Sequence, residues 1–454
     1  MRSWSAERIA GEAGATLIAT PGATGGPERA VIDSREAGAG TLFVGLRGAN
    51  LDGGEFAAAA LAAGAWGVLV GDRHAQALER DGRAGVVLGA DDPLAALQRL
   101  ATAWRRELAA EVIGVTGSTG KTSTKDLLLA LLAPHRRTVA SRANFNTEVG
   151  LPLEILAAPM GTELLVLEMA MRGAGQIAEL ARIAEPTVGV IVSVGPVHLE
   201  LLGTVEAIAA AKAELMAELP SGGTAVVPAA EPLLDPPLRT DLETITFGEE
   251  GQVRLLEAEG DRVKIDLAGT PIELEVSFTQ AHLRRNLLAA VAAASAVGVR
   301  PTGRVELALS PGRGQRAELG TGVTLIDDCY NANPMSMRAA LEDLADTAER
   351  ERRSRQVAVL GDMLELGAGE RSFHAEVGEL AGRTGVELLV TVGHRAEAMT
   401  ERFPGSVRSV GDAAEAASLV PTLLRAGDVV LVKGSRGVGL ELVCRALRNG
   451  DPAS

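Results

Sequence analysis

The chain has 454 residues, a length that exceeds a single hydrophobic core and predicts about three domains. Apolar residues make up 46% of it, but no uninterrupted apolar run reaches the roughly 18 residues of a membrane span. The formal net charge of -15 argues against general nucleic-acid binding, and aromatic residues, at 2%, are too few to stack exposed bases. We therefore expect small molecules as partners, no nucleic acid and no membrane span.

The compartment is indicated by the start of the chain and by its cysteines. Residues 1–8 lack the apolar stretch of a secretory signal. Cys329 and Cys444 form no sequence motif, which suits a reducing environment. We expect a cytoplasmic protein that acts as a monomer.

Short apolar runs that alternate with helical patterns predict an α/β fold with mainly parallel sheets. In the first part of the chain, strands are predicted at residues 42–46, 67–70 and 85–88, with an Ala-rich helix at 56–63. We assign residues 1–110 to a first α/β domain.

A second block begins with a predicted strand at residues 112–116, followed by buried-looking strands at 164–167 and 188–192. Around residues 243–278 the pattern changes to alternating apolar and polar residues. This change predicts antiparallel strands added to a mainly parallel sheet. We assign residues 111–309 to a central domain.

Pro and Gly residues interrupt the periodic pattern at residues 310–314, where we expect a linker. Beyond it, apolar runs again alternate with helices, which predicts a doubly wound, Rossmann-like domain at residues 310–454. The strands predicted in this domain are residues 323–326, 357–360, 388–392 and 429–432.

The segment GVTGSTGKTS at residues 114–123 follows a predicted strand and opens a helix that ends near Pro134. It contains a short G-x-x-G-K-T form of the phosphate-binding loop (P-loop), with Val115 where the longer pattern has glycine. Glycines let backbone N–H groups approach phosphate, and the helix N-terminus adds a favourable dipole. The predicted nucleotide-binding residues are Gly117, Ser118, Thr119, Gly120, Lys121, Thr122 and Ser123.

Within this loop, Lys121 is expected to contact the terminal phosphates, and the Thr122 hydroxyl to ligate Mg²⁺. The alternative interpretation is a Gly- and Thr-rich turn between a strand and a helix. The flanking strand and helix favour nucleotide binding.

Three further residues are candidates for the same site. Glu168 follows the predicted strand 164–167, where ligands of open sheets gather and where a carboxylate is suited to Mg²⁺; the alternative is a solvated carboxylate. His198 follows the next strand and reaches the same edge, although Mg²⁺ prefers oxygen ligands and a structural histidine is the simpler interpretation. Lys212 lies in a helical pattern at residues 205–219, where a solvated lysine is the simplest interpretation.

Several stretches together resemble the Mur ligase superfamily of peptidoglycan synthesis. They are GVTGSTGKTSTK at 114–125, NFNTEVG at 144–150, EMAMRG at 168–173 and GPVHLE at 195–200. Two more, DDCYNANP at 327–334 and LGDMLELG at 360–367, resemble the superfamily member that adds D-alanyl-D-alanine. These matches lie in all three predicted domains.

The resemblance implies a reaction and its partners. It implies ATP- and Mg²⁺-dependent ligation of D-alanyl-D-alanine to UDP-N-acetylmuramoyl-tripeptide through an acyl phosphate. It also implies an N-terminal uridine-nucleotide domain, a central ATP-binding domain and a C-terminal ligase domain. The alternatives are another Mur-type ligase, folylpolyglutamate synthase, or, in a different class, a nucleotide-driven switch or motor.

The resemblance further implies roles in catalysis. Lys121 would serve the ATP phosphates, while Thr122, Glu168, His198 and Lys212 would hold Mg²⁺. Lys212 would do so as a carbamylated lysine, because CO₂ on its amine turns a cation into an anionic oxygen ligand of the kind that Mg²⁺ prefers.

Other residues are assigned to nucleotide contacts by the same resemblance. Asn286, four residues after His282 at the start of an Ala-rich helix, is similar to the residue that faces adenine; the alternative is a helix cap with solvated polar side chains. Arg316 is similar to an arginine that reaches the γ-phosphate, and Asp328 to a ribose-binding aspartate. For both, the alternative is a solvated charge.

Substrate contacts are implied at both ends of the chain. Ser34 and Arg35 resemble residues that contact the UDP group, although the chain has Gly54 where a histidine is common in the family. Asn331 and Asn333 are assigned to the substrate. The segment at residues 433–437 either faces the dipeptide or forms a solvated turn.

Overall fold

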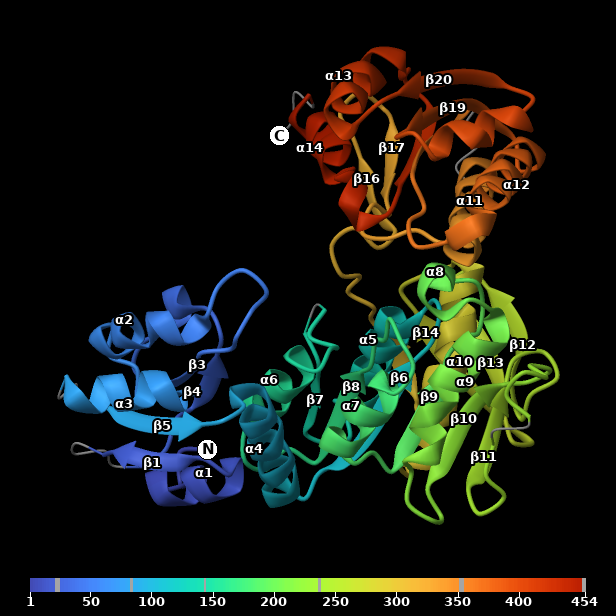
Figure 1. Cartoon of the computed structure of the whole chain (residues 1–454). Helices are drawn as coiled ribbons and strands as arrows, with labels where there is room; N and C mark the ends of the chain where they lie inside the picture. Colours follow the sequence, from blue (N-terminus) through green and yellow to red (C-terminus); the bar gives the residue numbers. More distant parts are fainter. Residues whose placement is uncertain (21–24, 82–84, 143, 236–237, 351–354, 451–454) are drawn as a thin grey trace.

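The computed structural model describes residues 1–20, 25–81, 85–142, 144–235, 238–350 and 355–450. In these ranges the chain forms three sheets in sequence order, each with helices packed against it. The third sheet lies above the second and apart from the first (Figure 1). This is the three-part α/β fold that the sequence predicts. None of the helices in the described ranges has the length and hydropathy needed to cross a membrane.

The first sheet has the order β1-β5-β4-β3-β2, in which β1 alone pairs antiparallel. Its strands are β1 (Thr16–Ala19), β2 (Arg29–Val31), β3 (Thr41–Val44), β4 (Gly67–Gly71) and β5 (Val86–Ala90). The accompanying helices are α1 (Ala6–Ala13), η1 (Ser34–Glu36), η2 (Gly53–Phe56), α2 (Ala57–Ala62), α3 (Asp72–Arg80) and α4 (Pro93–Leu108). The three strands predicted here and the Ala-rich helix are confirmed. Strands β1 and β2 escaped prediction because they are partly exposed and too short, at four and three residues, to give a clear strand pattern.

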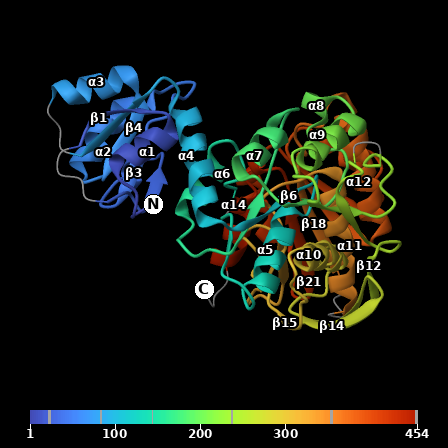
Figure 2. The same cartoon turned by 90° about the horizontal axis from the view of Figure 1, so that it is seen from below.

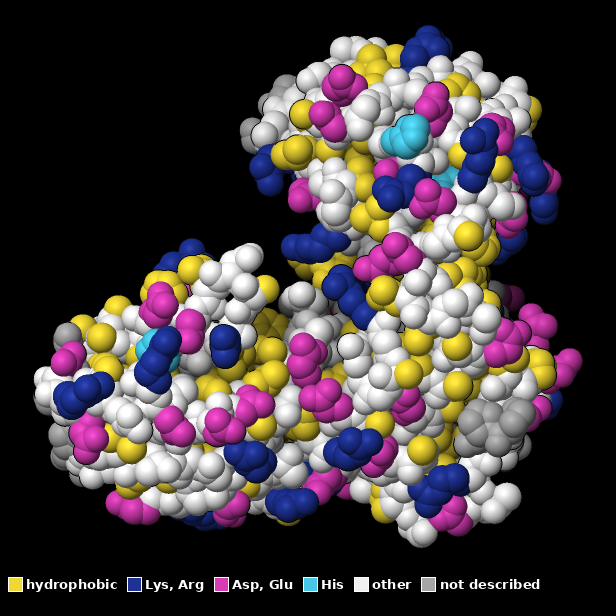
Figure 3. All heavy atoms as spheres, in the orientation of Figure 1, with side chains coloured by type: hydrophobic (Ala, Val, Ile, Leu, Met, Phe, Trp, Pro, Cys, Tyr) yellow, Lys and Arg dark blue, Asp and Glu magenta, His cyan; other side chains and the backbone are white. Residues whose placement is uncertain are grey.

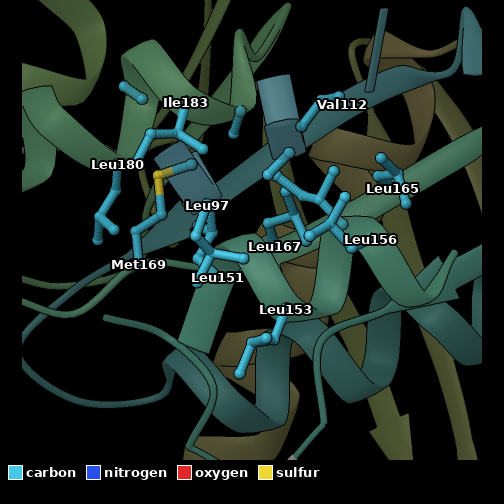
Figure 4. Close-up of a cluster of buried hydrophobic side chains, with 14 of the residues drawn as sticks. Leu97, Val112, Leu151, Leu153, Leu156, Leu165, Leu167, Met169, Leu180 and Ile183 are labelled. Carbon is cyan, nitrogen blue, oxygen red and sulfur yellow. The ribbon is translucent and has the colours of Figure 1, made fainter. Parts of the chain in front are cut away.

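Helix α4 joins the first sheet to the second, as the view from below shows (Figure 2). Its Trp104 packs edge-on against Trp4, with 5.4 Å between ring centroids, and donates from Nε1 to the Ala158 carbonyl at the end of α6 (Gly150–Ala157) at 3.0 Å. Leu97 of the same helix lies in a buried cluster with Leu151 and Leu180 (Figure 4). Because one hydrophobic cluster runs across residue 110, the boundary between residues 110 and 111 stays a prediction about folding units.

The second sheet has the order β15-β14-β13-β12-β11-β10-β9-β6-β8-β7. Its strands are β6 (Glu111–Thr116), β7 (Thr138–Ala140), β8 (Leu164–Glu168), β9 (Val188–Ile191), β10 (Thr224–Pro228), β11 (Glu243–Phe247), β12 (Val253–Glu259), β13 (Arg262–Leu267), β14 (Thr270–Val276) and β15 (Gly303–Val305). Its helices are α5 (Lys121–Leu132), α6 (Gly150–Ala157), α7 (Gln176–Ala184), α8 (Leu199–Leu202), α9 (Val205–Ala217) and α10 (Ala281–Ala296).

The antiparallel addition predicted around residues 243–278 is confirmed for β12, β13 and β14. It is wrong for β11, which pairs parallel with β10. The alternation at β11 reflects partial exposure, since only its last residue, Phe247, is buried. Exposure on one face produces the same sequence pattern whichever way the neighbouring strand runs.

Helices cover both faces of the parallel part of this sheet. Neighbouring residues of β6 point to opposite faces, so that Val112 and Ile113 belong to different hydrophobic clusters. Helix α10 is apolar around most of its circumference because it packs on the sheet and on α5. Strands buried on both faces explain the continuous apolar runs from which they were predicted.

The third sheet has the order β16-β17-β21-β18-β19-β20, in which β16 alone pairs antiparallel. Its strands are β16 (Gln315–Glu318), β17 (Thr324–Asp327), β18 (Arg355–Gly361), β19 (Val386–Val392), β20 (Ser406–Val410) and β21 (Asp428–Lys433). Its helices are α11 (Pro334–Arg350), η3 (Gly367–Gly369), α12 (Glu370–Arg383), η4 (Ala396–Glu401), α13 (Ala413–Leu423), η5 (Arg436–Val438) and α14 (Glu441–Asn449). The four strands predicted here are confirmed, whereas the edge strands β16 and β20 are largely polar and were missed.

The two cysteines form no sequence motif, yet the fold brings them together. Their sulfur atoms and a carboxylate oxygen of Asp327 lie within 4.8 Å of one another, all in buried residues. The Cys329 thiol donates to Asp327 at 3.0 Å, and Arg448 bonds the other carboxylate oxygen at 2.7 Å. A hydrogen bond with Cys329, together with burial, raises the pKa of the Cys444 thiol. These contacts help to hold α14 against β17.

Gly378 in α12 marks a backbone contact that leaves no room for a side chain. A Cβ atom there would lie 1.8 Å from the carbonyl oxygen of Met399 in η4. We expect Gly378→Ala to destabilise the protein by roughly 1–3 kcal/mol, because the backbone must shift to accept the methyl group. Thermal unfolding measures this loss.

Gly11→Ala in α1 is the matched control, since nothing lies within 4 Å of the Cβ position there. Alanine at that exposed helical position should stabilise the protein by about 0.5–1 kcal/mol. Equal melting temperatures for the two variants would contradict the close packing of α12 on η4.

Candidate active site

The phosphate loop joins β6 to α5, and contacts from the end of β9 fix its backbone. The Ser118 N–H donates to the Ser193 carbonyl at 2.9 Å, and the Ser118 hydroxyl donates to the Gly195 carbonyl at 3.0 Å. The Thr119 N–H donates to Ser193 Oγ at 2.9 Å. These N–H groups are therefore engaged within the protein. The first turn of α5, where Lys121, Thr122 and Ser123 lie, presents backbone N–H groups without helical partners.

Gly120 leaves room for the side chain of Asn286, on α10, to lie against this loop. Gly120 has a φ of 80°, and a Cβ atom there would lie 2.6 Å from Asn286 Oδ1 and 2.9 Å from Val192 Cγ1. Both the backbone conformation and the close approach require glycine. Asn286 is 8% exposed, so its alternative interpretation as a solvated side chain is wrong.

Lys121 begins α5 and folds back over the loop. Its Nζ atom donates to the Gly117 carbonyl at 2.7 Å. Burial lowers the pKa of Lys121, the charge of Glu168 raises it, and the charge of Arg313 lowers it. The ammonium group thus lies over the loop, near an acidic and a basic residue of other elements.

Glu168 ends β8 as a buried carboxylate with neutral partners. It is 2% exposed, and its two oxygens accept hydrogen bonds from the Thr122 hydroxyl and from Asn146 Nδ2, each at 2.8 Å. The interpretation as a solvated carboxylate is therefore wrong. Neutral donors leave the charge of a buried carboxylate uncompensated, and a divalent cation would compensate it. The hard oxygen atoms of Thr122 and Glu168 fit Mg²⁺.

Asn146 and Ser193 are site residues that sequence reasoning missed. Asn146 lies in the stretch NFNTEVG, which supported the resemblance but had no assigned role. Ser193 fixes the phosphate loop from β9. Their only sequence signal was position, one within a resembling stretch and the other at a strand end.

His198 lies at the start of α8 with a φ of 54°, in the left-handed region. Its Nδ1 atom is hydrogen-bonded to Oε2 of Glu365, which precedes η3 of the third sheet. Burial lowers the pKa of His198, Glu365 raises it, and the charges of Lys121 and Lys212 lower it. His198 therefore lies within electrostatic range of both predicted site lysines.

Lys212 is buried in α9, with 2% of its surface exposed. The interpretation as a solvated lysine is therefore wrong. The sequence could not show this, because the Ala-rich pattern of α9 does not reveal which face of the helix is buried. Burial, with a smaller effect from the charge of Lys121, holds the pKa of Lys212 well below its usual value. A buried amine that favours its neutral form is the species that can react with CO₂.

Replacing Lys212 with methionine is expected to stabilise the ligand-free protein. In the unfolded chain the lysine keeps its proton up to its usual pKa of 10.5, whereas the pKa of the folded residue is lower. The unfolded state therefore binds more protons between these values, and wild-type stability rises with pH in this window. At pH 7 the variant should melt several degrees higher, since ~1 kcal/mol shifts the melting temperature of such domains by about 2–4 °C.

Thermal scans in carbonate-free buffer test this prediction. The advantage of Lys212→Met should shrink as the pH approaches 10.5, where both states lose the proton. An advantage that stays constant from pH 7 to pH 10 would contradict the lowered pKa.

Arg316 and Asp328 of the third sheet gather near His282 at the start of α10. Arg316 bonds Asp343 at 2.5 Å and Thr347 at 2.7 Å, both on α11. Burial lowers the pKa of His282, while the charges of Asp343 and Asp328 raise it. Arg316 and Asp328 are thus engaged in ion pairs, which excludes their interpretation as free solvated charges.

The segment after β17 is held by local hydrogen bonds. Lys433 is 2% exposed and donates to Asp328 Oδ2 at 2.6 Å and to the Asn331 carbonyl at 2.9 Å, so a solvated turn is wrong for this residue. Asn333 Oδ1 accepts from the Ser336 N–H at 2.9 Å and so caps the first turn of α11. The structure thus brings Asp328, Asn331 and Lys433 together.

Arg313 is a third residue that sequence reasoning missed. It lies in the predicted linker, and its charge acts on Lys121 of the phosphate loop. Its guanidinium carbon lies 4.2 Å from the centroid of the Tyr330 ring. Linker composition gave no reason to select it, because only the fold brings this segment to the loop.

Ser34 and Arg35 lie in η1, between β2 and β3 of the first sheet. A wide opening separates this part of the molecule from the third sheet (Figure 3). Hydrogen bonds from Arg35 lower the pKa of Asp33 to about 2 and order the turn that follows β2. A Cβ atom at Gly54 would lie 2.3 Å from Cδ2 of His74. The space beside Gly54, where the family commonly has a histidine side chain, is therefore filled by another histidine.

Comparison with known proteins places this chain in a family. The Mur ligase middle domain matches residues 115–294, and the Mur ligase, glutamate ligase domain matches residues 312–436. UDP-N-acetylmuramoyl-tripeptide–D-alanyl-D-alanine ligase of Synechocystis sp. is 36% identical over 430 residues, covering 93% of this chain and 92% of that protein.

Solved structures agree over nearly the whole length. The crystal structure of MurF from Acinetobacter baumannii has a TM-score of 0.85 at 26% identity, covering 98% of this chain and 99% of that one. MurF ligase from Thermotoga maritima in complex with ADP has a TM-score of 0.79 at 30% identity, covering 93% and 97%. The chain belongs to the Mur ligase family.

Proposed function

We propose that this protein is an ATP-dependent ligase that joins D-alanyl-D-alanine to UDP-N-acetylmuramoyl-tripeptide, giving the UDP-pentapeptide precursor of peptidoglycan. The observation that carries the proposal is the preformed phosphate loop, with Lys121 above it and the buried Thr122–Glu168 pair beside it. Relatives that span the chain and bear this ligase name support the choice of substrates.

The metal site of the proposal consists of Thr122, Glu168, His198 and carbamylated Lys212. Mg²⁺ bound there would neutralise charge on the phosphates during transfer. Within the described residues, the Glu168 carboxylate accepts hydrogen bonds only from the neutral donors Thr122 and Asn146. The buried amine of Lys212 favours its neutral form, which suits carbamate formation. The positive charge of Lys121 disfavours a positive charge on Lys212. A carbamate on Lys212 would replace that charge with anionic oxygen atoms.

In the proposed first step, a carboxylate oxygen of the tripeptide attacks the γ-phosphorus of ATP, and the bond to ADP breaks. Lys121 neutralises the transferring phosphoryl group, and N–H groups at the start of α5 orient it. Arg316 is proposed to reach the γ-phosphate, which requires it to leave Asp343. Arg313, whose charge already acts on Lys121, is a second candidate for that contact.

In the second step, the amine of D-alanyl-D-alanine attacks the acyl phosphate, and the tetrahedral intermediate expels phosphate with loss of a proton. Asn331 and Asn333 are proposed to face the substrates. Asp328, beside them, is assigned to the ribose of ATP, and Asn286 is assigned to adenine. Exclusion of water by domain closure would protect the acyl phosphate from hydrolysis.

The proposal assigns residues 1–110 to the UDP substrate, with Ser34 and Arg35 as contacts, residues 111–309 to ATP, and residues 310–454 to the ligase domain. The wide opening between the first and third sheets supports closure on substrate binding (Figure 3). Identical small-angle scattering with and without ligands would contradict closure. We further propose a monomer that works in the cytoplasm, where ATP and nucleotide-linked precursors are made.

Phosphate release tests the function. The protein is supplied with ATP, Mg²⁺ and either UDP-N-acetylmuramoyl-tripeptide, D-alanyl-D-alanine or both, and products are identified by mass. Release that needs both compounds and yields the UDP-pentapeptide supports the proposal. Release with a folate and glutamate, or with another amino acid, would favour the alternative ligases. Release without any acceptor would favour a switch or motor.

A further inference from the structure

We propose that Glu365 is a positioning residue that reaches across from the third sheet and orients His198 as a metal ligand. The inference rests on the proposed function, in which His198 binds Mg²⁺. It adds that the ligand set is completed only when the third sheet is seated on the second.

Glu365 is held against the second sheet by three contacts. Its Oε2 atom is hydrogen-bonded to His198 Nδ1, and its carbonyl accepts the Glu200 N–H at 3.2 Å. Its Oε1 atom lies 3.6 Å from Nη2 of Arg172. Because Glu365 is held through both its side chain and its backbone, its carboxylate has little freedom to turn away from the His198 imidazole.

The backbone on both sides is shaped for this contact. His198 has a φ of 54° and Glu365 a φ of 62°, a conformation that costs free energy for residues other than glycine. At Gly367, a Cβ atom would lie 3.3 Å from the backbone nitrogen and Cα of Glu200. Strained residues facing each other across a close approach indicate a specific interface between α8 and the turn before η3.

The chemistry of histidine assigns the role. A metal-ligating histidine usually donates its other ring N–H to a carboxylate or carbonyl, which fixes its tautomer and ring orientation. The contact of Nδ1 with Glu365 leaves Nε2 of His198 for the metal. Because the carboxylate comes from the third sheet, metal binding and the seating of that sheet must favour each other.

Mn²⁺ binding in the presence of a non-hydrolysable ATP analogue tests the proposal by electron paramagnetic resonance, without turnover. We expect Glu365→Ala to weaken Mn²⁺ binding about 10- to 100-fold. Glu365→Gln keeps an oxygen that can accept from Nδ1, and it should recover much of that loss. Affinity for the analogue without metal should not change, whereas a general structural role would lower it as well.

Glu370→Ala is the matched control, because Glu370 lies five positions along the chain and pairs with Arg395 of the same sheet. It should leave Mn²⁺ affinity unchanged. Normal Mn²⁺ affinity in Glu365→Ala would overturn the inference.

His198→Ala distinguishes a failure of the proposed metal ligand from a failure of the Glu365 contact. If it does not weaken Mn²⁺ binding, the metal-ligand role of the proposed function fails. If it does, while Glu365→Ala has no effect, only the role of Glu365 fails. The double variant should lose little more than His198→Ala alone, because both changes remove one interacting unit.

Discussion

Replacing Lys121 with alanine is expected to lower kcat at least a hundred- to a thousandfold, about the loss seen when one preorganised donor is removed from a transition state. The Nζ atom folds over the phosphate loop and bonds the Gly117 carbonyl at 2.7 Å. The fold should survive, since that contact lies within one loop. Phosphate release with all three substrates measures the loss.

The effect of Lys121→Ala should fall mainly on kcat and less on the KM for ATP, because charge on the transferring phosphoryl group changes most in the transition state. Lys264→Ala is the matched control, as Lys264 lies on β13 of the same sheet and pairs with Glu257 at its surface. A kcat within twofold of the wild type in Lys121→Ala would contradict the assigned phosphate site.

Replacing Lys212 with alanine is expected to reduce activity at least about a hundredfold, more than the loss of a residue that only supports a metal ligand. The reason is the loss of the anionic oxygen that the proposed carbamate would supply, which no other member of the proposed ligand set replaces. Formate, acetate or bicarbonate should restore part of the activity, because the buried side chain leaves a space that a small acid can enter.

Lys212→Arg provides the control for this rescue. Arginine keeps a positive charge, fills the space and cannot form the lysine carbamate, so it should stay inactive with or without added acid. Full activity of Lys212→Ala in the absence of any rescuing acid would contradict a ligand role for Lys212. Steady-state phosphate release across a series of acid concentrations measures both variants.

Central strands were predictable from the sequence because each is an apolar run buried on both faces. This holds for β6, β8 and β9 of the second sheet and for β21 of the third. Edge strands such as β16 and β20 were not predictable, because a partly exposed strand has no apolar run to mark it. Strand direction also escaped prediction at β11, since alternation reports exposure and not the direction of the neighbour.

The proposed phosphate loop was predictable from the sequence alone, since its glycines, lysine and threonine are contiguous and the prediction depends on their spacing. Glu168 was placed at the correct sheet edge because the carboxyl ends of parallel strands meet there. Only the tertiary structure decided that Lys212 is buried, because an Ala-rich helix has no polar face to reveal its orientation. The tertiary structure alone brings Glu365 to His198, 167 positions away in the sequence. It also brings Arg313 close enough for its charge to act on Lys121 of the phosphate loop. Contacts between distant segments depend on how three sheets pack, and no local pattern of residues records that packing.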